Sequence, residues 1–423
     1  MSDPTLDALR AALDSAGDPD GGGLVRPAGE GDLLAGRRPR YVAAPASTAQ
    51  VAAVLRTAAG HGLTVVARGG GTRQDWAAPP ERLDLVVETA RLTGVVEHAA
   101  GDLIVAVRAG TRLDELADRL APAGQQLALD VPLAGGTVGG AISANPSGPR
   151  RMRYGTVRDL LIGVTVVRAD GVVARAGGRV VKNVAGYDLG KLVTGAYGTL
   201  GLVTEAVFRL HPLPAATAYV RRWVDGPEAA GPLVAAVLGA QVVPSAVEVD
   251  APPGDGVEVT VLLEGTPAGV AARAASTAAL LGAGADVSAE APPGWGAYPW
   301  EPGGVGLKLT AALSGVPGLL ATARAAAGRY RAPLAVRGSA GTGVLHAGLP
   351  AATEPPVVAA LLDELREATA RAGGHAVVLT APPPVRELVD LWGPVPGLAL
   401  MRRIKAQFDP DARLAPGRFV GGI

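Results

Sequence analysis

Hydrophobic residues recur along this chain with two different spacings, and each spacing predicts one kind of element. At residues 51–58 they follow the i, i+3, i+4, i+7 pattern of an amphipathic helix, with Ser47 ahead of it as a cap. The β-branched run at 64–66 then predicts a strand. A second strand at 103–107 precedes a second helix, which we expect Thr111 to cap. The first part of the chain is therefore predicted to alternate helix and strand.

The region 161–175 predicts a β-hairpin, with Asp170 and Gly171 in a primed turn. The next strand ends at Pro212 and Pro214, which cannot continue a ladder, and we place a domain boundary there. Beyond it, strand, helix and strand follow one another twice, as in split β-α-β units that build an antiparallel sheet with helices on one face. The strands of this second part are expected at 219–224, 246–249, 257–263, 305–309, 334–337, 344–349 and 376–379.

These patterns predict an α+β protein made of four segments. Residues 1–37 form a loosely attached N-terminal arm, and residues 38–214 form the first domain. Residues 215–382 form a smaller α+β domain of split β-α-β type, and residues 383–423 return to the first domain.

Composition narrows the chemistry. The 423 residues carry 39 basic and 39 acidic side chains and no cysteine, and 48% of them are hydrophobic. A protein of this kind folds without disulfides, and it offers no thiolate nucleophile, no Cys-ligated zinc and no Cys-held iron–sulfur cluster. The balanced charge argues against a nucleic-acid partner. No apolar run reaches the roughly 18 residues of a membrane span, and residues 1–26 lack the order of a signal peptide. We therefore expect a cytoplasmic protein, associated with a membrane only through partners.

Glycine clusters supply the strongest functional signal. Arg68-Gly69-Gly70-Gly71-Thr72 follows the first predicted strand, and its glycines would let several backbone N–H groups point at one anion, such as a diphosphate. An ordinary turn is the alternative for this cluster alone. A second cluster at 135–148 has small residues at almost every position, so a flat ring or phosphate chain could lie against bare backbone. A third glycine-rich stretch spans 178–201. No G-x-G-x-x-G follows a strand, which disfavours a Rossmann site for a nicotinamide cofactor.

Five motifs occur in a fixed order, and together they resemble the FAD-binding domain of the vanillyl-alcohol oxidase/p-cresol methylhydroxylase type. The motifs are RGGGT (68–72), GGTVGG (135–140), YGTVRDL (154–160), KNVAGYDL (182–189) and GTLGLVT (198–204). The resemblance covers residues 38 to about 214, and the tail at 408–419 resembles the segment that closes this family over its flavin. It implies a two-part FAD-binding domain followed by a smaller second domain. Within the family, the length and the KNVAGYD stretch are most similar to FAD-binding subunits of glycolate oxidase.

The resemblance also implies which residues hold FAD. Arg68, Gly69, Gly70, Gly71 and Thr72 would cradle the diphosphate, mainly through backbone N–H groups. The residues expected to line the isoalloxazine and ribityl portion are Pro132, Gly136, Thr137, Gly139, Gly140, Ser143 and Gly148. Tyr154 and Gly155 are expected to lie nearby. The backbone of Leu202 and Val203 is expected to contact the adenine end. Family members that bind flavin covalently use a His after the glycine loop or a Cys in the second cluster. Here the glycine loop ends at Thr72 without such a His, and the chain has no Cys, so we expect FAD to be bound noncovalently. Ala415 replaces the Asn of the family's Asn-Pro-Gly tail, which removes a polar contact.

Oxidation of a 2-hydroxy acid needs a cation for the carboxylate and a base for the hydroxyl proton. Related 2-hydroxyacid dehydrogenases carry a metal-binding motif that resembles H-x-G-D-G-N-x-H. The comparable stretch here, residues 341–348, contains one histidine and no carboxylate, so no metal site is predicted. His346 is a candidate base, although a hydrogen-bonded histidine in a sheet is the commoner case. Arg402, Arg403 or Lys405 could contact the substrate carboxylate or the flavin. The alternative is that the three residues form a basic helix face exposed to solvent. Tyr187, Asp188 and Lys182 are expected mainly to fix their loop.

The leading hypothesis is an FAD-binding subunit of a glycolate oxidase-like complex that oxidises a 2-hydroxy acid. A homologous flavin subunit and an iron–sulfur subunit would be its partners, since this chain has no Cys for a cluster. The alternatives are a self-sufficient FAD-linked 2-hydroxyacid dehydrogenase and a non-catalytic scaffold that keeps the flavin fold.

Overall fold

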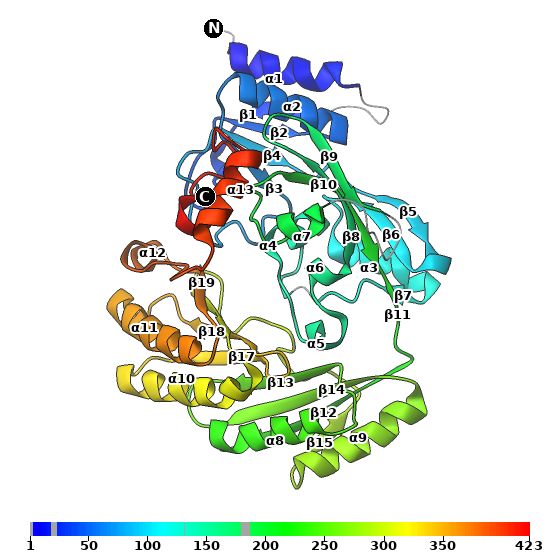
Figure 1. The fold of residues 1–423 in the computed structure, drawn as a ribbon, viewed down its shortest axis with the longest axis vertical. Helices are drawn as coiled ribbons and strands as arrows, with labels where there is room; N and C mark the ends of the chain where they lie inside the picture. The colour runs from blue at the N-terminus through cyan, green and yellow to red at the C-terminus, as the bar shows by residue number, and fades with distance from the viewer. Residues whose placement is uncertain (1–2, 18–22, 131, 179–186) are drawn as a thin grey trace. The chain divides into compact units, whose positions relative to one another are not determined.

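The computed structural model describes residues 3–17, 23–130, 132–178 and 187–423 (Figure 1). The chain divides into two compact units. The first comprises Met1–Pro146, Thr156–Leu213 and Val395–Ile423, and the second comprises Ser147–Gly155 and Pro214–Pro394. Compared with the predicted domains, the units also divide the chain at residue 214, but the second one takes in residues 147–155 and extends to residue 394.

The first unit contains two principal sheets and several short helices. Its four-stranded sheet has the order β1 (Leu24–Pro27), β2 (Tyr41–Ala44), β4 (Leu85–Glu88), β3 (Val65–Arg68), and its five-stranded sheet the order β5 (Val95–Ala99), β6 (Ile104–Arg108), β10 (Leu202–Arg209), β8 (Leu161–Val167), β9 (Val173–Gly177). A two-stranded sheet pairs β7 (Gln125–Gln126) with β11 (His211–Pro212). The helices are α1 (Pro4–Ser15), α2 (Thr48–Gly60), α3 (Leu113–Leu120), α4 (Val138–Ala144), α6 (Val157–Leu160), α7 (Leu189–Val193) and α13 (Leu398–Phe408), with 3-10 turns at Glu30–Asp32, Ala100–Asp102, Ala121–Ala123 and Val420–Gly422.

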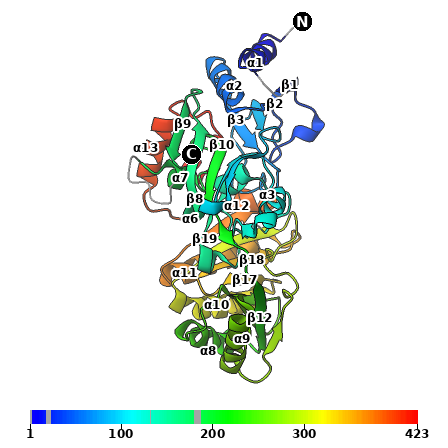
Figure 2. The same cartoon turned by 90° about the vertical axis from the view of Figure 1, so that its right-hand side faces the viewer.

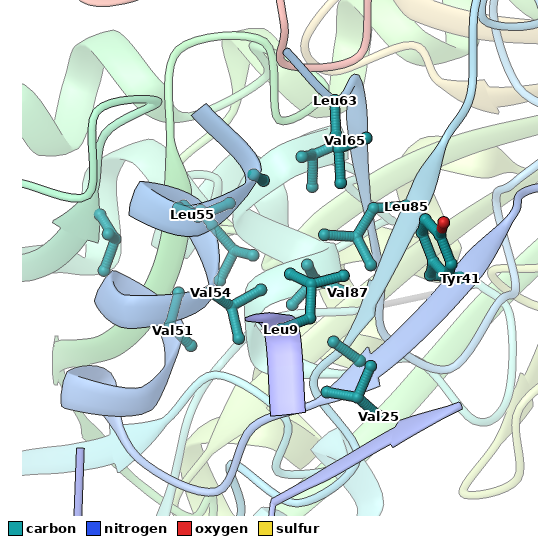
Figure 3. Packing of buried hydrophobic residues seen from close by; sticks show 14 of the residues in the cluster. Leu9, Val25, Tyr41, Val51, Val54, Leu55, Leu63, Val65, Leu85 and Val87 are labelled. Carbon is teal, nitrogen blue, oxygen red and sulfur yellow. The ribbon is translucent and has the colours of Figure 1, made fainter. Parts of the chain in front are cut away.

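The N-terminal helix α1 is part of a hydrophobic core. Asp3 caps it by accepting the N–H groups of Thr5 and Leu6. Leu9 is fully buried, and Figure 3 shows it pointing among Val54 of α2 and Val87 of β4. Burial of one such leucine contributes about 1.5–3 kcal/mol. The expectation of a loosely attached arm is therefore wrong for this helix.

Two local predictions are corrected by hydrogen bonds. The Thr111 hydroxyl accepts the N–H of Gly94, while α3 begins after Arg112 without a side-chain cap. In the hairpin of β8 and β9, Gly171 has φ +78° and its N–H donates to the Arg168 carbonyl, whereas Asp170 does not have a positive φ. This is a three-residue loop with glycine in the left-handed position rather than a primed two-residue turn.

The C-terminal segment is joined to the edge of the four-stranded sheet. The N–H of Ala415 donates to the Val65 carbonyl at 2.8 Å, and the N–H of Val65 donates to the Arg413 carbonyl at the same distance. Lys405 on α13 is 6% exposed, and its ammonium donates to the Thr199 carbonyl, the Leu414 carbonyl and the Asp409 carboxylate at 2.7–2.9 Å. These bonds place the end of the chain beside β3.

The second unit is an eight-stranded antiparallel sheet with its long helices on one face, as Figures 1 and 2 show. Its strand order is β15 (Asp286–Ser288), β12 (Ala216–Val224), β14 (Val257–Gly265), β13 (Ala246–Ala251), β17 (Ala335–Ser339), β18 (Val344–Leu349), β16 (Val305–Thr310), β19 (Ala376–Thr380). The helices are α5 (Arg151–Tyr154), α8 (Pro227–Gly239), α9 (Pro267–Leu281), α10 (Val316–Tyr330), α11 (Pro355–Arg371) and α12 (Pro383–Leu388), with a 3-10 turn at Leu313–Gly315. Two β-α-β-β-α-β repeats meet at β13 and β17. The predicted split β-α-β sheet is confirmed, and β15 is the strand that was missed.

Candidate active site in the first unit

The first glycine loop leaves β3 at Arg68, whose side chain holds the start of the loop. One nitrogen of its guanidinium donates to Asp32 at 2.9 Å and also pairs with Glu88. Arg26 binds the same Asp32, and the two arginines hold the pKa of that carboxyl far below its usual range. The charge of Arg68 is thus already neutralised by the protein, which leaves the recognition of a ligand at this loop to the backbone.

The backbone of Gly69–Thr72 is free to bind an anion. Among the described residues, none accepts a hydrogen bond from the four N–H groups of this loop. Gly71 has φ +73°, and a Cβ added there would meet no atom within 4 Å, so this part of the loop borders open space. Consecutive unsatisfied N–H groups in such a turn form an anion-binding concavity.

The second glycine cluster packs directly against the first. A Cβ on Gly70 would stand 1.9 Å from the carbonyl oxygen of Gly135, and one on Gly69 would stand 2.3 Å from the Thr137 hydroxyl. Thr137 caps α4, because its hydroxyl accepts the N–H of Gly140 at 3.2 Å. Glycine is therefore required at 69 and 70 by the close approach of two loops, and Gly70 does not have a positive φ.

The third stretch brings an aromatic side chain to the same place. The N–H of Tyr197 donates to the Ser143 carbonyl at 2.9 Å, and its ring lies 5.8 Å from that of Phe419. Burial raises the pKa of Tyr197 to about 12, against the opposing effect of Arg418 and Arg73. Its phenol is therefore neutral at physiological pH.

Arg418 links the C-terminal segment to the residues that follow the first glycine loop. It is 4% exposed, and its guanidinium donates to the carbonyls of Gln74 and Trp76, both at 2.8 Å. A buried guanidinium with fixed acceptors is a preorganised positive charge at the edge of the loop.

Residues of these three stretches and Arg418 line one cleft. Ten of the predicted cofactor residues line it: Gly69, Gly70, Gly71, Thr72, Thr137, Gly139, Gly140, Ser143, Leu202 and Val203. Sequence reasoning missed Ala67, Arg73, Gln74, Thr89, Ala144, Tyr197, Gly198, Gly201 and Arg418. Gly198 and Gly201 belong to the GTLGLVT motif, and Arg418 belongs to the tail motif, so those motifs contained the signal.

The remaining predicted residues are not among those that line this cleft. Pro132 and Gly136 belong to the first unit but do not line the cleft, and Arg68 lies behind the loop in its ion pairs. Gly148, Tyr154 and Gly155 belong to the second unit.

Tyr154 is fixed to the sheet of the second unit. Its hydroxyl donates to Glu264 at 3.0 Å, and burial raises the pKa of this phenol.

The candidate cations and bases are not among the described residues that line the cleft. Arg402 is exposed and donates to the Gly421 carbonyl at 3.1 Å, and Arg403 is exposed too. The Lys405 ammonium donates all three of its hydrogen bonds within the protein, so the prediction that it contacts a substrate or the flavin is wrong. His346 lies on β18 of the second unit, and Lys182 is outside the described residues.

The described residues contain no group of three or more His, Cys, Asp or Glu side chains that could hold a metal ion. No helix among them is long and apolar enough to cross a membrane.

Two family descriptions match the chain. The "FAD binding domain" matches residues 39–177, and the "FAD linked oxidases, C-terminal domain" matches residues 307–419. The chain carries both of these domains. FAD is therefore its cofactor, and the cleft has features that FAD needs, since bare backbone and free N–H groups line it.

Several curated proteins are similar to part of the chain. Glycolate oxidase subunit GlcD of Bacillus subtilis is 32% identical over 211 residues, 50% of this chain and 45% of that protein. Glycolate oxidase subunit GlcE of Escherichia coli is 39% identical over 138 residues, 32% of this chain and 39% of that protein. D-lactate dehydrogenase of Archaeoglobus fulgidus is 34% identical over 171 residues, 40% and 38% of the two chains. The chain thus spans less than half the length of each of these relatives.

The fold is similar to that of a solved p-cresol methylhydroxylase. The two structures share a TM-score of 0.76 with 17% identity, over 98% of this chain and 96% of the other. The predicted fold class, α+β of the p-cresol methylhydroxylase type, is confirmed.

Proposed function

We propose that the chain is an FAD-dependent oxidoreductase that acts on a 2-hydroxy acid such as glycolate, with FAD held noncovalently in the glycine-lined cleft. The observation that carries the proposal is the loop Gly69–Thr72, whose unbonded N–H groups border a cleft within the part that matches the FAD-binding description. Relatives named for glycolate and D-lactate support the substrate class.

The chain's own residues would bind and orient the cofactor. The N–H groups of Gly69–Thr72 would meet the diphosphate, and the backbone of Leu202 and Val203 would meet the adenine end. Gly139 and Gly140 would leave room for the ribityl chain and the ring. When bound, FAD supplies the acceptor for the two electrons of the alcohol. Pro132, Gly136, Gly148, Tyr154 and Gly155 remain proposed neighbours of the flavin.

We further propose that the chain works in a complex. The similarity to two different glycolate oxidase subunits supports a homologous flavin subunit as a partner. The chain contains no cysteine, so an iron–sulfur partner, a quinone or another acceptor must take the electrons from its flavin. The similarity to D-lactate dehydrogenase favours a second candidate, a self-sufficient 2-hydroxyacid dehydrogenase.

One experiment separates these functions. The chain is purified alone and with proteins that co-purify from its native operon, loaded with FAD and mixed anaerobically with glycolate or D-lactate in a stopped-flow instrument. We expect slow or absent flavin bleaching by the isolated chain and bleaching by the complex. General-base catalysis contributes about 10²–10⁴ in rate, and no Asp, Glu or His is among the described residues that line the cleft. Fast, saturable bleaching of the isolated chain refutes the accessory role and supports the second candidate. A chain that binds no FAD refutes the proposed function.

A further inference from the structure

The C-terminal segment, residues 413–419, is attached to the chain on both sides of the first glycine loop. Ahead of the loop, the N–H of Ala415 donates to the carbonyl of Val65 in β3 at 2.8 Å. Beyond the loop, the Pro416 carbonyl accepts the N–H of Glu81 at 2.9 Å. The glycine loop therefore lies between two points of the chain that are tied to one segment.

Arg418 makes the attachment nearest to the loop. Its side chain is buried, and one terminal nitrogen of the guanidinium donates to the carbonyls of Gln74 and Trp76, both at 2.8 Å. The other terminal nitrogen donates to the side-chain oxygen of Gln74 at 3.3 Å. A planar guanidinium that donates to several acceptors fixes their relative orientation. Since Gln74 is two residues beyond Thr72, Arg418 fixes the chain where it leaves the loop.

Gln74 extends this attachment across the loop. Its side-chain nitrogen donates to the Ala67 carbonyl at 3.4 Å, and its backbone N–H donates to the Gly71 carbonyl at 3.4 Å. Because its side-chain oxygen accepts from Arg418, this one glutamine connects the strand before the loop, the turn of the loop and the C-terminal segment. Gln74 and Arg418 both line the cleft.

The C-terminal segment has its own anchor, away from the loop. The Asp409 carboxylate is buried, accepts the N–H of Leu414 at 2.7 Å and pairs with Lys405 at 2.7 Å. The Lys405 ammonium also donates to the Leu414 carbonyl at 2.9 Å. A buried network whose members are hydrogen-bonded is rigid. Arg418 thus projects from a fixed support, and its bonds constrain Gln74.

Charges of both signs lie near Arg418. Arg73 also lines the cleft. Asp75 is exposed, and a carboxylate oxygen of Glu81 lies 3.0 Å from the position that a Cβ on Gly417 would take. We therefore assign to Arg418 the role that its hydrogen bonds define, and not that of an excess positive charge.

We propose that Arg418 is a positioning residue for the diphosphate of FAD. Three consecutive glycines have many conformations available, so their N–H groups converge on one anion only when the loop is held from outside. By fixing Gln74 and Trp76, Arg418 holds Gly69–Thr72 in that conformation before the cofactor arrives, which lowers the entropic cost of binding. The inference rests on the proposed function, because it takes FAD to be bound with its diphosphate at this loop.

The test starts from the full-length, FAD-loaded protein and uses ADP as a second ligand, because ADP has the diphosphate without the flavin. Free FAD is separated by ultrafiltration after dilution, and the Kd of ADP follows from its competition with FAD. Arg418→Met should raise the Kd of both ligands by about tenfold or more, since both use the loop. Arg418→Lys keeps the charge but not the planar donor group, and should raise both by about threefold or more. Arg10→Met, which removes a half-exposed cation from α1 of the same unit, should behave like the parent.

A double-mutant cycle tests whether Arg418 acts through Gln74. Gln74→Met should itself weaken ADP binding, and the loss in the double variant should be smaller than the product of the two single losses, because each change removes the same contact. Losses that multiply overturn the inference. If Arg418→Met does not fold, Arg418→Lys takes its place in the cycle.

Two other results also overturn the inference. One is equal binding of FAD and ADP by the parent and Arg418→Met. The other is weaker binding of FAD with unchanged binding of ADP, which would assign Arg418 to the flavin part of the cofactor and not to the loop.

The outcome is separable from the proposed function. Binding of FAD and ADP that depends on Arg418, without flavin reduction by glycolate or D-lactate, supports the inference and refutes the function. Flavin reduction together with binding that does not depend on Arg418 does the reverse.

Discussion

The contact between the two glycine loops makes Gly70→Ala the sharpest perturbation of the cofactor site. The added Cβ would lie 1.9 Å from the Gly135 carbonyl oxygen, so that the loops must separate by roughly 1 Å or more to reach ordinary contact distance. Overpacking of this kind costs about 1–3 kcal/mol. Because the loops border the cleft from both sides, we expect the cost to fall on cofactor binding. FAD affinity should drop about 5- to 150-fold, since 1.4 kcal/mol corresponds to a factor of ten.

The assay measures the ratio of flavin to protein absorbance after loading, the FAD Kd by titration, and the melting temperature of the FAD-free protein. Gly60→Ala is the matched control, because Gly60 ends α2 and an added Cβ there meets nothing within 4 Å. That variant should bind FAD like the parent and be equally or slightly more stable.

Two results would refute the reasoning. If Gly70→Ala binds FAD with the parent's Kd, the approach of the two loops does not define the cofactor site. If it lowers the melting temperature of the FAD-free protein by far more than the estimated cost allows, the contact supports the whole unit rather than the cleft.

Three further outcomes are expected. Acid precipitation of the holoprotein should release intact FAD into the supernatant, because the chain has no Cys and no His is among the described residues that line the cleft; flavin in the pellet would contradict this. Lys405→Met should lower the free energy of unfolding by about 3–5 kcal/mol in urea titrations, because it leaves the buried Asp409 carboxylate unpaired, and a variant as stable as the parent would argue against this buried pair. Burial lowers the pKa of Lys308 from 10.5 to about 8, so between these pH values the unfolded chain holds a proton that the folded chain has released, and stability rises with pH. Lys308→Met should therefore raise the free energy of unfolding by on the order of 1–3 kcal/mol at pH 7 and by less near pH 10; a constant difference across this range would be inconsistent with the shift.

The local pattern of polar and apolar residues was sufficient to predict those helices and strands whose own residues show a clear periodicity. The strand at 64–66 and the helix beginning after Ser47 are β3 and α2, and every strand expected in the second unit is present. Alternation of polar and apolar residues reports directly on which face of a strand is buried, so it needs no knowledge of distant contacts. The strand Asp286–Ser288 was missed because it is short and largely exposed, so its residues show little alternation.

The sequence by itself indicated FAD as the cofactor, because five motifs in a fixed order resemble those of an FAD-binding domain, and it predicted that glycine loops would hold the cofactor. It could not tell that Gly70 is required by the Gly135 carbonyl, since that contact joins residues far apart in the chain. Nor could it separate Lys405, which is buried among its own acceptors, from Lys308, for which no described residue accepts a hydrogen bond, because a lysine's role is set by the atoms that surround its ammonium. Residue types and spacing decide which backbone shapes are possible. Only the tertiary structure decides which charges are neutralised inside the fold, because that depends on distances between elements that the sequence places far apart.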